Sequence, residues 1–250
     1  MSKPQVIFLD AVGTLFGVRD SVGTIYSRIA QKYGVITAPQ AVNQAFYESF
    51  QGAKRPLAFP DAPLAEIPEL EYEWWQAIAR RTFETVLVVP PQILEERDIE
   101  RREEHITQFL AQATPDPDAA RGVLHHFNDF TSFFDDLYSY FSLADAWEIY
   151  ADIPKTLEKW RREEVEMGII SNFDLRLHAV LEALGLRNYF KSITLSSVSG
   201  SAKPNPKIFA LALRKHRCAP NRAWYIGDSV EHDYKGAKAA GLQPFLLKRS

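Results

Sequence analysis

Three aspartates and one lysine are the residues of this sequence whose types and spacing could do chemistry together. Asp10 and Asp228 each follow a short apolar run, and Asp233 comes five residues after the second of them. Carboxylates gathered without compensating charge repel one another, and a hard cation such as Mg²⁺, held by a few oxygens and several waters, relieves that repulsion. Lys203 supplies a positive point charge for an anionic substrate. These residue types favour a magnesium site beside an anion site.

A glycine-containing turn and two short polar residues could hold such an anion. The turn VGTLFG at 12–17 offers backbone N–H groups to phosphate oxygens, Gly13 allows close approach, and Thr14 is its candidate substrate-binding residue. Ser171 and Asn172 end another apolar run. Taken singly, each residue has an ordinary structural explanation, since strand-end aspartates often cap helices and a lysine before proline is common in loops. The combination is what predicts a site.

Short apolar runs that alternate with helical patterns must position these side chains. The expected strands cover 5–11, 167–171, 192–197, 223–228 and 243–247, and the expected helices between them cover 174–185, 206–216 and 231–241. Repeated β-α-β units predict an α/β fold with a Rossmann-like parallel sheet and helices on both faces. Ligands of such sheets bind at the carboxyl ends of the strands, where the polar residues fall.

The residues between the first strand and the rest of the sheet have only helical patterns. The expected helices cover 21–34, 39–51, 71–86, 92–112 and 125–141. We therefore predict a core domain from 1–17 and 151–250, with an all-helical insertion at 18–150. The charged stretch 92–112 is best interpreted as a solvated helix face, with partner binding as the alternative.

Composition excludes several classes of protein. The chain has 250 residues, 46% of them hydrophobic and 24% charged, which is typical of a compact globular protein. Lys and Arg total 29 against 32 Asp and Glu, and the formal net charge of −3 gives no field that attracts nucleic acid or anionic membranes. No apolar run reaches the roughly 18 residues of a membrane span. We expect a cytoplasmic protein without nucleic-acid or membrane partners.

Four segments of the chain resemble motifs I to IV of the haloacid dehalogenase-like hydrolases. They are DAVGTLF (10–16), IISNFD (169–174), SAKPNPKIF (201–209) and YIGDSVEHDYKGAKAAG (225–241). The resemblance covers 5–17 and roughly 150–248, and the helical insertion resembles the C1 cap of that superfamily. The sequences of the first two segments are most similar to those of the branch named after a rhythmically expressed insect gene.

The resemblance implies a mechanism and a set of site residues. Asp10 would attack phosphorus and form an aspartyl-phosphate, which splits one hard step into two. Ser171, with Asn172 beside it, would hydrogen-bond the transferring phosphoryl oxygens, and Lys203 would neutralise their charge. The implied Mg²⁺ site consists of Asp10, the backbone carbonyl of Val12, Asp228 and Asp233, the last of which supports the metal's waters or orients the lysine.

Val12 is the departure from the pattern. Phosphatases of this superfamily usually have an aspartate there that protonates the leaving group, a contribution typically worth ~10²–10⁴-fold in rate. We expect a magnesium-dependent phosphatase that acts on a small phosphorylated metabolite. Two alternatives stay open: a catalytically weak or inactive binding or scaffold protein, and a phosphonatase- or dehalogenase-like hydrolase. A protein partner or a homodimer could use the cap.

Overall fold

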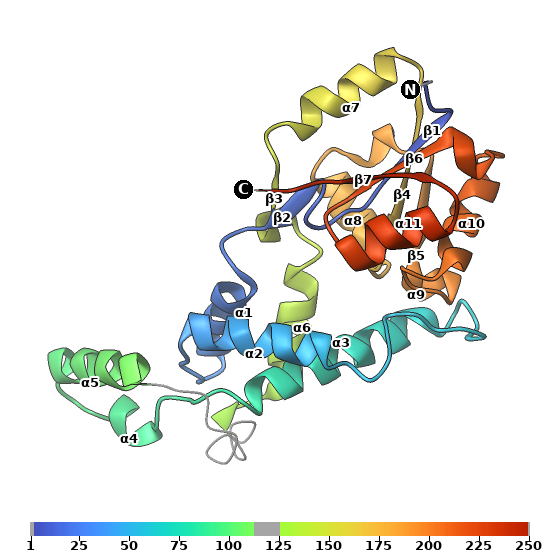
Figure 1. Cartoon of the computed structure of the whole chain (residues 1–250). Coiled ribbons are helices and arrows are strands. Elements are labelled where there is room, and N and C mark those ends of the chain that lie inside the picture. The colour runs from blue at the N-terminus through green and yellow to red at the C-terminus, as the bar shows by residue number, and fades with distance from the viewer. Residues whose placement is uncertain (1–2, 113–125, 250) are drawn as a thin grey trace. The chain divides into compact units, whose positions relative to one another are not determined.

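The computed structural model describes residues 3–112 and 126–249. Contacts divide the chain into two compact units (Figure 1). One, here called the α/β unit, consists of the residues up to Val18, Arg55–Glu71 and the residues from Phe141 onward; the other, here called the helical unit, consists of Arg19–Lys54 and Tyr72–Tyr140. The division differs from the predicted boundaries, because residues 55–71 and 141–150 group with the sheet.

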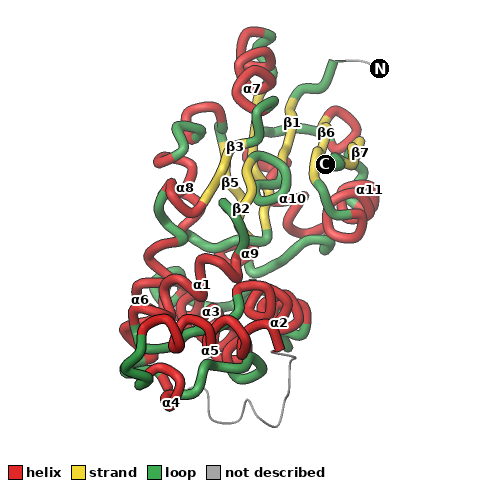
Figure 2. Tube along the Cα trace, turned by 90° about the vertical axis from the view of Figure 1, so that its left-hand side faces the viewer, coloured by secondary structure: helices red, strands yellow, loops and turns green. Residues whose placement is uncertain are grey.

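The α/β unit contains a five-stranded sheet with the order β5-β4-β1-β6-β7. Its strands are β1 (Val6–Leu9), β4 (Glu166–Ser171), β5 (Ser192–Leu195), β6 (Ala223–Gly227) and β7 (Gln243–Leu246). Every neighbouring pair is parallel, and Figure 2 shows the strands in yellow among the helices of the unit. The predicted parallel sheet with helices on both faces is confirmed.

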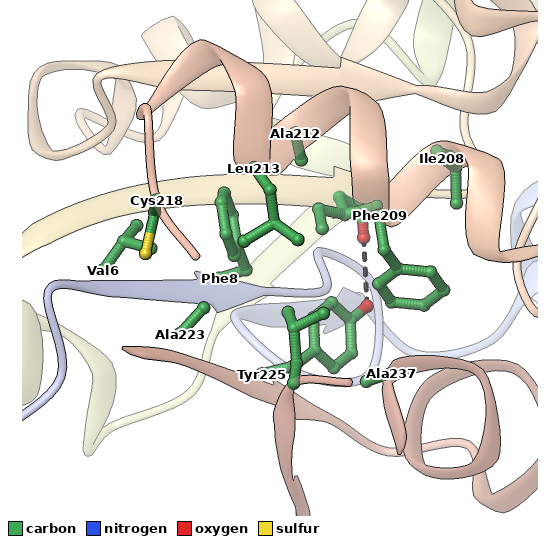
Figure 3. Close-up of a cluster of buried hydrophobic side chains, with 12 residues drawn as sticks. Val6, Phe8, Ile208, Phe209, Ala212, Leu213, Cys218, Ala223, Tyr225 and Ala237 are labelled. Atoms are coloured by element: carbon green, nitrogen blue, oxygen red, sulfur yellow. Dashed lines mark hydrogen bonds between the residues drawn. The ribbon is translucent and has the colours of Figure 1, made fainter. Parts of the chain in front are cut away.

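The central strand β1 is buried on both faces. Val6 and Phe8 belong to a cluster with apolar residues of α10 (Pro206–Lys215) and α11 (Gly236–Ala239), which Figure 3 draws as sticks. Ile7 and Leu9 point to the opposite face because side chains alternate along a strand, and they are 0% and 1% exposed. Such burial explains why the run VIFL is apolar throughout rather than alternating.

A small two-stranded antiparallel sheet was not predicted. It pairs β2 (Phe16–Val18) with β3 (Trp147–Ile149), and the rings of Phe16 and Trp147 lie 5.2 Å apart. Strands of three residues give too little alternation to be recognised in a sequence. Helix α7 (Ile153–Arg162), which follows β3, was also not predicted.

Three expected elements near the site have different bounds in the structure. The strand expected at 192–197 stops at Leu195, and a short helix, α9 (Ser196–Ser199), follows it. Serine side chains compete for backbone groups at this point, and the left-handed Gly200 ends the turn. The helix expected at 231–241 is a π-helical turn, η5 (Val230–Lys235), followed by α11. The helix expected at 174–185 is α8 (Arg176–Ala183).

The remaining helices belong to the predicted insertion. They are α1 (Val22–Lys32), α2 (Pro39–Gln51), α3 (Ile67–Phe83), α4 (Pro91–Leu94), α5 (Ile99–Gln112) and α6 (Phe130–Tyr140). Helix α3 begins four residues earlier than predicted, since a proline fits within a first helical turn. The stretch 92–112 is divided between α4 and α5. Helix α6 buries Phe133 and Phe134, so the aromatic pattern is core; residue 125, where that helix was expected to begin, lies outside the described residues. None of the described helices is long and apolar enough to cross a bilayer.

Candidate active site

The register of the sheet brings the predicted site residues to one edge. Leu9 of β1 pairs with Ile169 of β4 and with Ile226 of β6. Asp10 follows directly, and its backbone N–H donates to the carbonyl of Ile226 at 2.9 Å. Ser171 at the end of β4 and Asp228 just after β6 therefore flank Asp10 on either side. The prediction from strand ends placed these three residues together for the same reason.

The three aspartates lie close enough to share one ion. Asp10, Asp228 and Asp233 each offer a carboxylate oxygen, and these oxygens lie within 4.8 Å of one another. Asp10 and Asp233 are 8% and 1% exposed, whereas Asp228 is exposed. Gly13 makes this approach possible: its φ is +83°, and a Cβ atom there would lie 2.5 Å from Oδ2 of Asp228. A side chain at position 13 would occupy the space of the carboxylate.

Lys203 lies among the acids and is buried with them. Its Nζ is 2.8 Å from Oδ1 of Asp10 and 2.6 Å from Oδ1 of Asp233. Burial alone lowers the pKa of Lys203, but Asp10 and Asp233 outweigh this effect and raise it above its ordinary value. The lysine is therefore charged and fixed between two carboxylates.

The carboxylates remain undercompensated by this single lysine. Burial raises the pKa of Asp10 to about 6, with Asp233 adding to the rise and Lys203 opposing it. Partial burial and Asp233 also raise the pKa of Asp228. Three carboxylates and one ammonium group have a formal net charge of two negative units, and an oxygen-only set with one exposed member suits a hard divalent cation that keeps several waters. Mg²⁺ fits this donor set.

The predicted anion-binding groups occupy different environments. Ser171 is 3% exposed at the end of β4. The side chain of Asn172 bonds both backbone groups of Lys203: Oδ1 accepts from the N–H at 2.7 Å, and Nδ2 donates to the carbonyl at 3.0 Å. Thr14 is fully buried, and its hydroxyl has no hydrogen-bond partner among the described residues. Asn172 thus holds the lysine loop, and its contact with substrate stays a prediction.

Val12 places no acid in the site. It forms a bridge with Phe16 inside the turn that follows Asp10, and its side chain is partly buried. The metal contact through its carbonyl stays a prediction. No acid takes its place within the turn itself, whose sequence is VGTLFG.

Tyr225 is the site residue that the sequence did not reveal. It is fully buried on β6, and its hydroxyl lies 2.7 Å from Oδ1 of Asp233, 2.9 Å from Nζ of Lys203 and 3.1 Å from the carbonyl of Ile170. Figure 3 shows the last of these as a dashed line. A buried tyrosine usually finds a partner for its hydroxyl, so a tyrosine three residues before Asp228 in an apolar strand was the available signal.

Arg249 also reaches the turn after Asp10. Its Nη2 donates to the carbonyl of Thr14 at 2.5 Å, and its guanidinium lies 4.1 Å from the ring centre of Tyr150. No motif marked this arginine in the sequence.

Comparisons with known proteins agree with this geometry. A family model described as haloacid dehalogenase-like hydrolase matches residues 4–241. Haloacid dehalogenase-like hydrolase domain-containing protein 3 of Bos taurus is 29% identical over 243 residues, 97% of this chain and 81% of that protein. The glyceraldehyde 3-phosphate phosphatase of Methanopyrus kandleri is 33% identical over 101 residues, 40% of this chain and 43% of that protein.

A solved structure shares the fold. The HAD phosphatase from Thermococcus onnurineus superposes with a TM-score of 0.57 at 17% identity, covering 98% of this chain and 87% of its own. The family match spans both the sheet and the helical insertion, and Asp10, Asp228 and Lys203 meet at one edge of the sheet. The chain therefore belongs to the haloacid dehalogenase-like hydrolases.

Proposed function

We propose that the protein is a magnesium-dependent phosphatase that acts on a small phosphorylated metabolite through an aspartyl-phosphate on Asp10. The observation that carries the proposal is the position of Lys203, whose Nζ lies 2.8 Å from Asp10 and 2.6 Å from Asp233. A nucleophilic carboxylate, a fixed cation and a metal-binding acid cluster are what phosphoryl transfer requires of a protein. The phosphatase activity named for one relative supports the same reaction class.

Each site residue has its own role in the proposed reaction. An oxygen of Asp10 forms the bond to phosphorus as the bond to the leaving oxygen breaks, and water then attacks the aspartyl-phosphate and releases phosphate. Lys203 offsets charge on the phosphoryl oxygens, and Ser171 is the candidate hydrogen-bond donor to them. Asp10, Asp228 and Asp233 would hold Mg²⁺, which supplies charge neutralisation when bound.

Val12 restricts the substrates. A valine cannot protonate a leaving oxygen, so the leaving group must depart as a stable anion or take its proton from elsewhere. We expect acyl and aryl phosphates to react faster than alkyl phosphates, because their leaving groups have lower pKa values. Without the usual acid, alkyl phosphates lose roughly 10²–10⁴-fold in rate.

The test is an assay of the full chain with acetyl phosphate and p-nitrophenyl phosphate, with Mg²⁺ and with EDTA. The matched variants are Asp10→Asn, which removes the nucleophile, and Val12→Asp, which supplies the usual acid. Magnesium-dependent turnover that disappears in Asp10→Asn supports the proposal. If only Val12→Asp turns over, the native protein is a binding protein with intact phosphatase machinery, and the proposal fails.

A further inference from the structure

The segment Arg55–Glu71 belongs to the α/β unit although it lies between helices of the predicted cap. Three contacts attach it to the carboxyl edge of the sheet. The hydroxyl of Ser196 donates to the carbonyl of Leu57 at 2.5 Å, and Gly200 approaches Pro60 so closely that a Cβ atom would lie 2.9 Å from its Cα. The third contact is made by Glu71, the last residue of the segment.

Glu71 is a buried carboxylate outside the acid cluster. It is 1% exposed, and its Oε1 accepts the backbone N–H of Leu175 at 3.1 Å. Ser197 of α9 also favours the charged form of this carboxylate by lowering its pKa. The N–H of Leu175 is one of the unsatisfied donors at the start of α8, where an acidic group is favourable. Glu71 thus caps a helix that lies 104 residues further along the chain.

The turn that Glu71 contacts leads directly to the candidate active site. Leu175 follows Asn172 by three residues, and the side chain of Asn172 holds the backbone of Lys203 through two hydrogen bonds. Ser171 precedes Asn172 and ends β4. One end of the turn is therefore fixed to Lys203, and the other end is fixed to Glu71.

We propose that Glu71 is a positioning residue, which anchors the turn from Asn172 to Leu175 and thereby holds Ser171 and Asn172 in register with Lys203. The anchoring is independent of catalysis; only its effect on turnover rests on the proposed phosphatase function. Asp174 and Arg176 strengthen the anchor. The carboxylate of Asp174 accepts hydrogen bonds from three groups of Arg176: the backbone N–H at 2.9 Å, Nε at 3.0 Å and Nη2 at 2.7 Å.

The anchor is sensitive to protonation. Burial raises the pKa of Glu71 to about 7, with Asp174 adding to the rise, while Ser197, the Leu175 N–H and Arg176 oppose it. The charged carboxylate accepts a stronger hydrogen bond than the neutral acid. His178 of α8 also titrates nearby in the sequence, but burial lowers its pKa below 6.5. A transition near neutral pH at Leu175 therefore reports Glu71.

The experiment follows the Leu175 amide and the Asn172 side-chain amide of the full chain by NMR between pH 5 and 8.5. We expect both signals in the native protein to shift with a midpoint near pH 7, and we expect Glu71→Gln to remove the shift while keeping Leu175 protected, because glutamine still offers an oxygen. Glu69→Gln, an exposed neighbour on α3, is the matched control and should titrate like the native protein.

Glu71→Ala completes the test. It should speed exchange of the Leu175 amide by roughly 10- to 100-fold relative to that of Ile169, since a hydrogen bond to a charged group is lost. If Glu71→Ala does not fold, the Glu71→Gln titration decides alone. A transition that persists in Glu71→Gln, or an Asn172 signal that does not respond, overturns the proposal. These NMR signals can be measured without catalytic turnover. Absence of phosphatase activity would therefore contradict the proposed function but would not affect the test of Glu71.

Discussion

The hydroxyl of Tyr225 lies 2.7 Å from Oδ1 of Asp233, in a fully buried position on β6. Nζ of Lys203 lies 2.6 Å from the same oxygen. Burial and the neighbouring acids, Asp233 first among them, raise the pKa of Tyr225 well above its usual value, so the hydroxyl keeps its proton. The tyrosine therefore links the lysine and the acid to strand β4, on the far side of β1, through the carbonyl of Ile170.

Tyr225→Phe tests this link. The ring keeps its contact with Phe209, but Lys203 and Asp233 each lose a buried partner. We expect a loss of about 1–3 kcal/mol in the free energy of unfolding, together with a lower kcat in any phosphatase assay. Urea unfolding measures the first effect. Tyr47→Phe, at an exposed tyrosine, should change neither quantity, and equal stabilities of the two variants would contradict the role given to Tyr225.

Gly13→Ala should weaken Mg²⁺ binding although Gly13 is not a ligand. The added methyl group would lie 2.5 Å from Oδ2 of Asp228 and must displace that carboxylate. Gly185→Ala is the matched control, because Gly185 also has a positive φ, +70°, but a Cβ atom there meets nothing within 4 Å. Both variants share a backbone penalty of roughly 1–2 kcal/mol. Titration calorimetry with Mg²⁺ should therefore distinguish them, and matching affinities would show that Asp228 does not bind the ion.

Asp228→Asn should act in opposite directions with and without metal. Its pKa is raised by partial burial and by Asp233, so the charged form opposes folding as the pH rises above the ordinary value of 3.8. In EDTA at neutral pH, removing the charge should raise the melting temperature. Excess Mg²⁺ should stabilise the native protein through binding and stabilise Asp228→Asn less. Glu84→Gln, at an exposed position, should follow the native protein in both conditions.

His216 should make stability depend on pH. Its Nε2 lies 2.7 Å from Oγ of Ser192, and its Nδ1 lies 2.7 Å from Oε2 of Glu166. Burial lowers the pKa of His216 although Glu166 opposes the shift. The unfolded chain therefore binds a proton first as the pH falls below 6.5, and stability is lost in that range.

His216→Gln does not titrate and isolates this effect. Urea unfolding at pH 7.5 and 5.5 should show a larger decrease for the native protein than for the variant. The absolute stability of His216→Gln should also be lower, by about 1–3 kcal/mol where buried Ser192 loses its partner. A decrease of the same size in both proteins would mean that another group controls this pH range.

The sequence predicted the sheet and the edge where the acids meet, because both depend on local patterns. Runs such as VIFL are buried on two faces, and polar residues follow them where parallel strands end. The four motifs also retain their order. Local patterns therefore located Asp10, Ser171, Lys203 and Asp228 before any contact was known.

Contacts between distant segments could not be predicted in this way. The hydrogen bond from Leu175 to Glu71 joins residues 104 apart, and nothing in the proline-rich segment before Glu71 marks it as part of the α/β unit. The contacts of Tyr225 could not be predicted for the same reason. Its hydroxyl reaches the carbonyl of Ile170 only because β4 and β6 lie on either side of β1. The early end of β5 follows from serine hydroxyls that bond to backbone carbonyls of both near and distant residues.

The pairing of β2 with β3 also changes the loop that the chain must close to reach its native topology. Leu9 and Ile169 must meet for β1 and β4 to pair, and the segment between them is a long loop. Once Phe16 has paired with Ile149, only residues 10–15 and 150–168 lie between the two pairings, so the effective loop is about sixfold shorter. The entropy of loop closure scales with the logarithm of length, and this shortening lowers its cost by roughly 1.6 kcal/mol. Pairing β2 with β3 itself closes the segment 19–146, so the long closure is made once and the pairing of β1 with β4 adds only a short one.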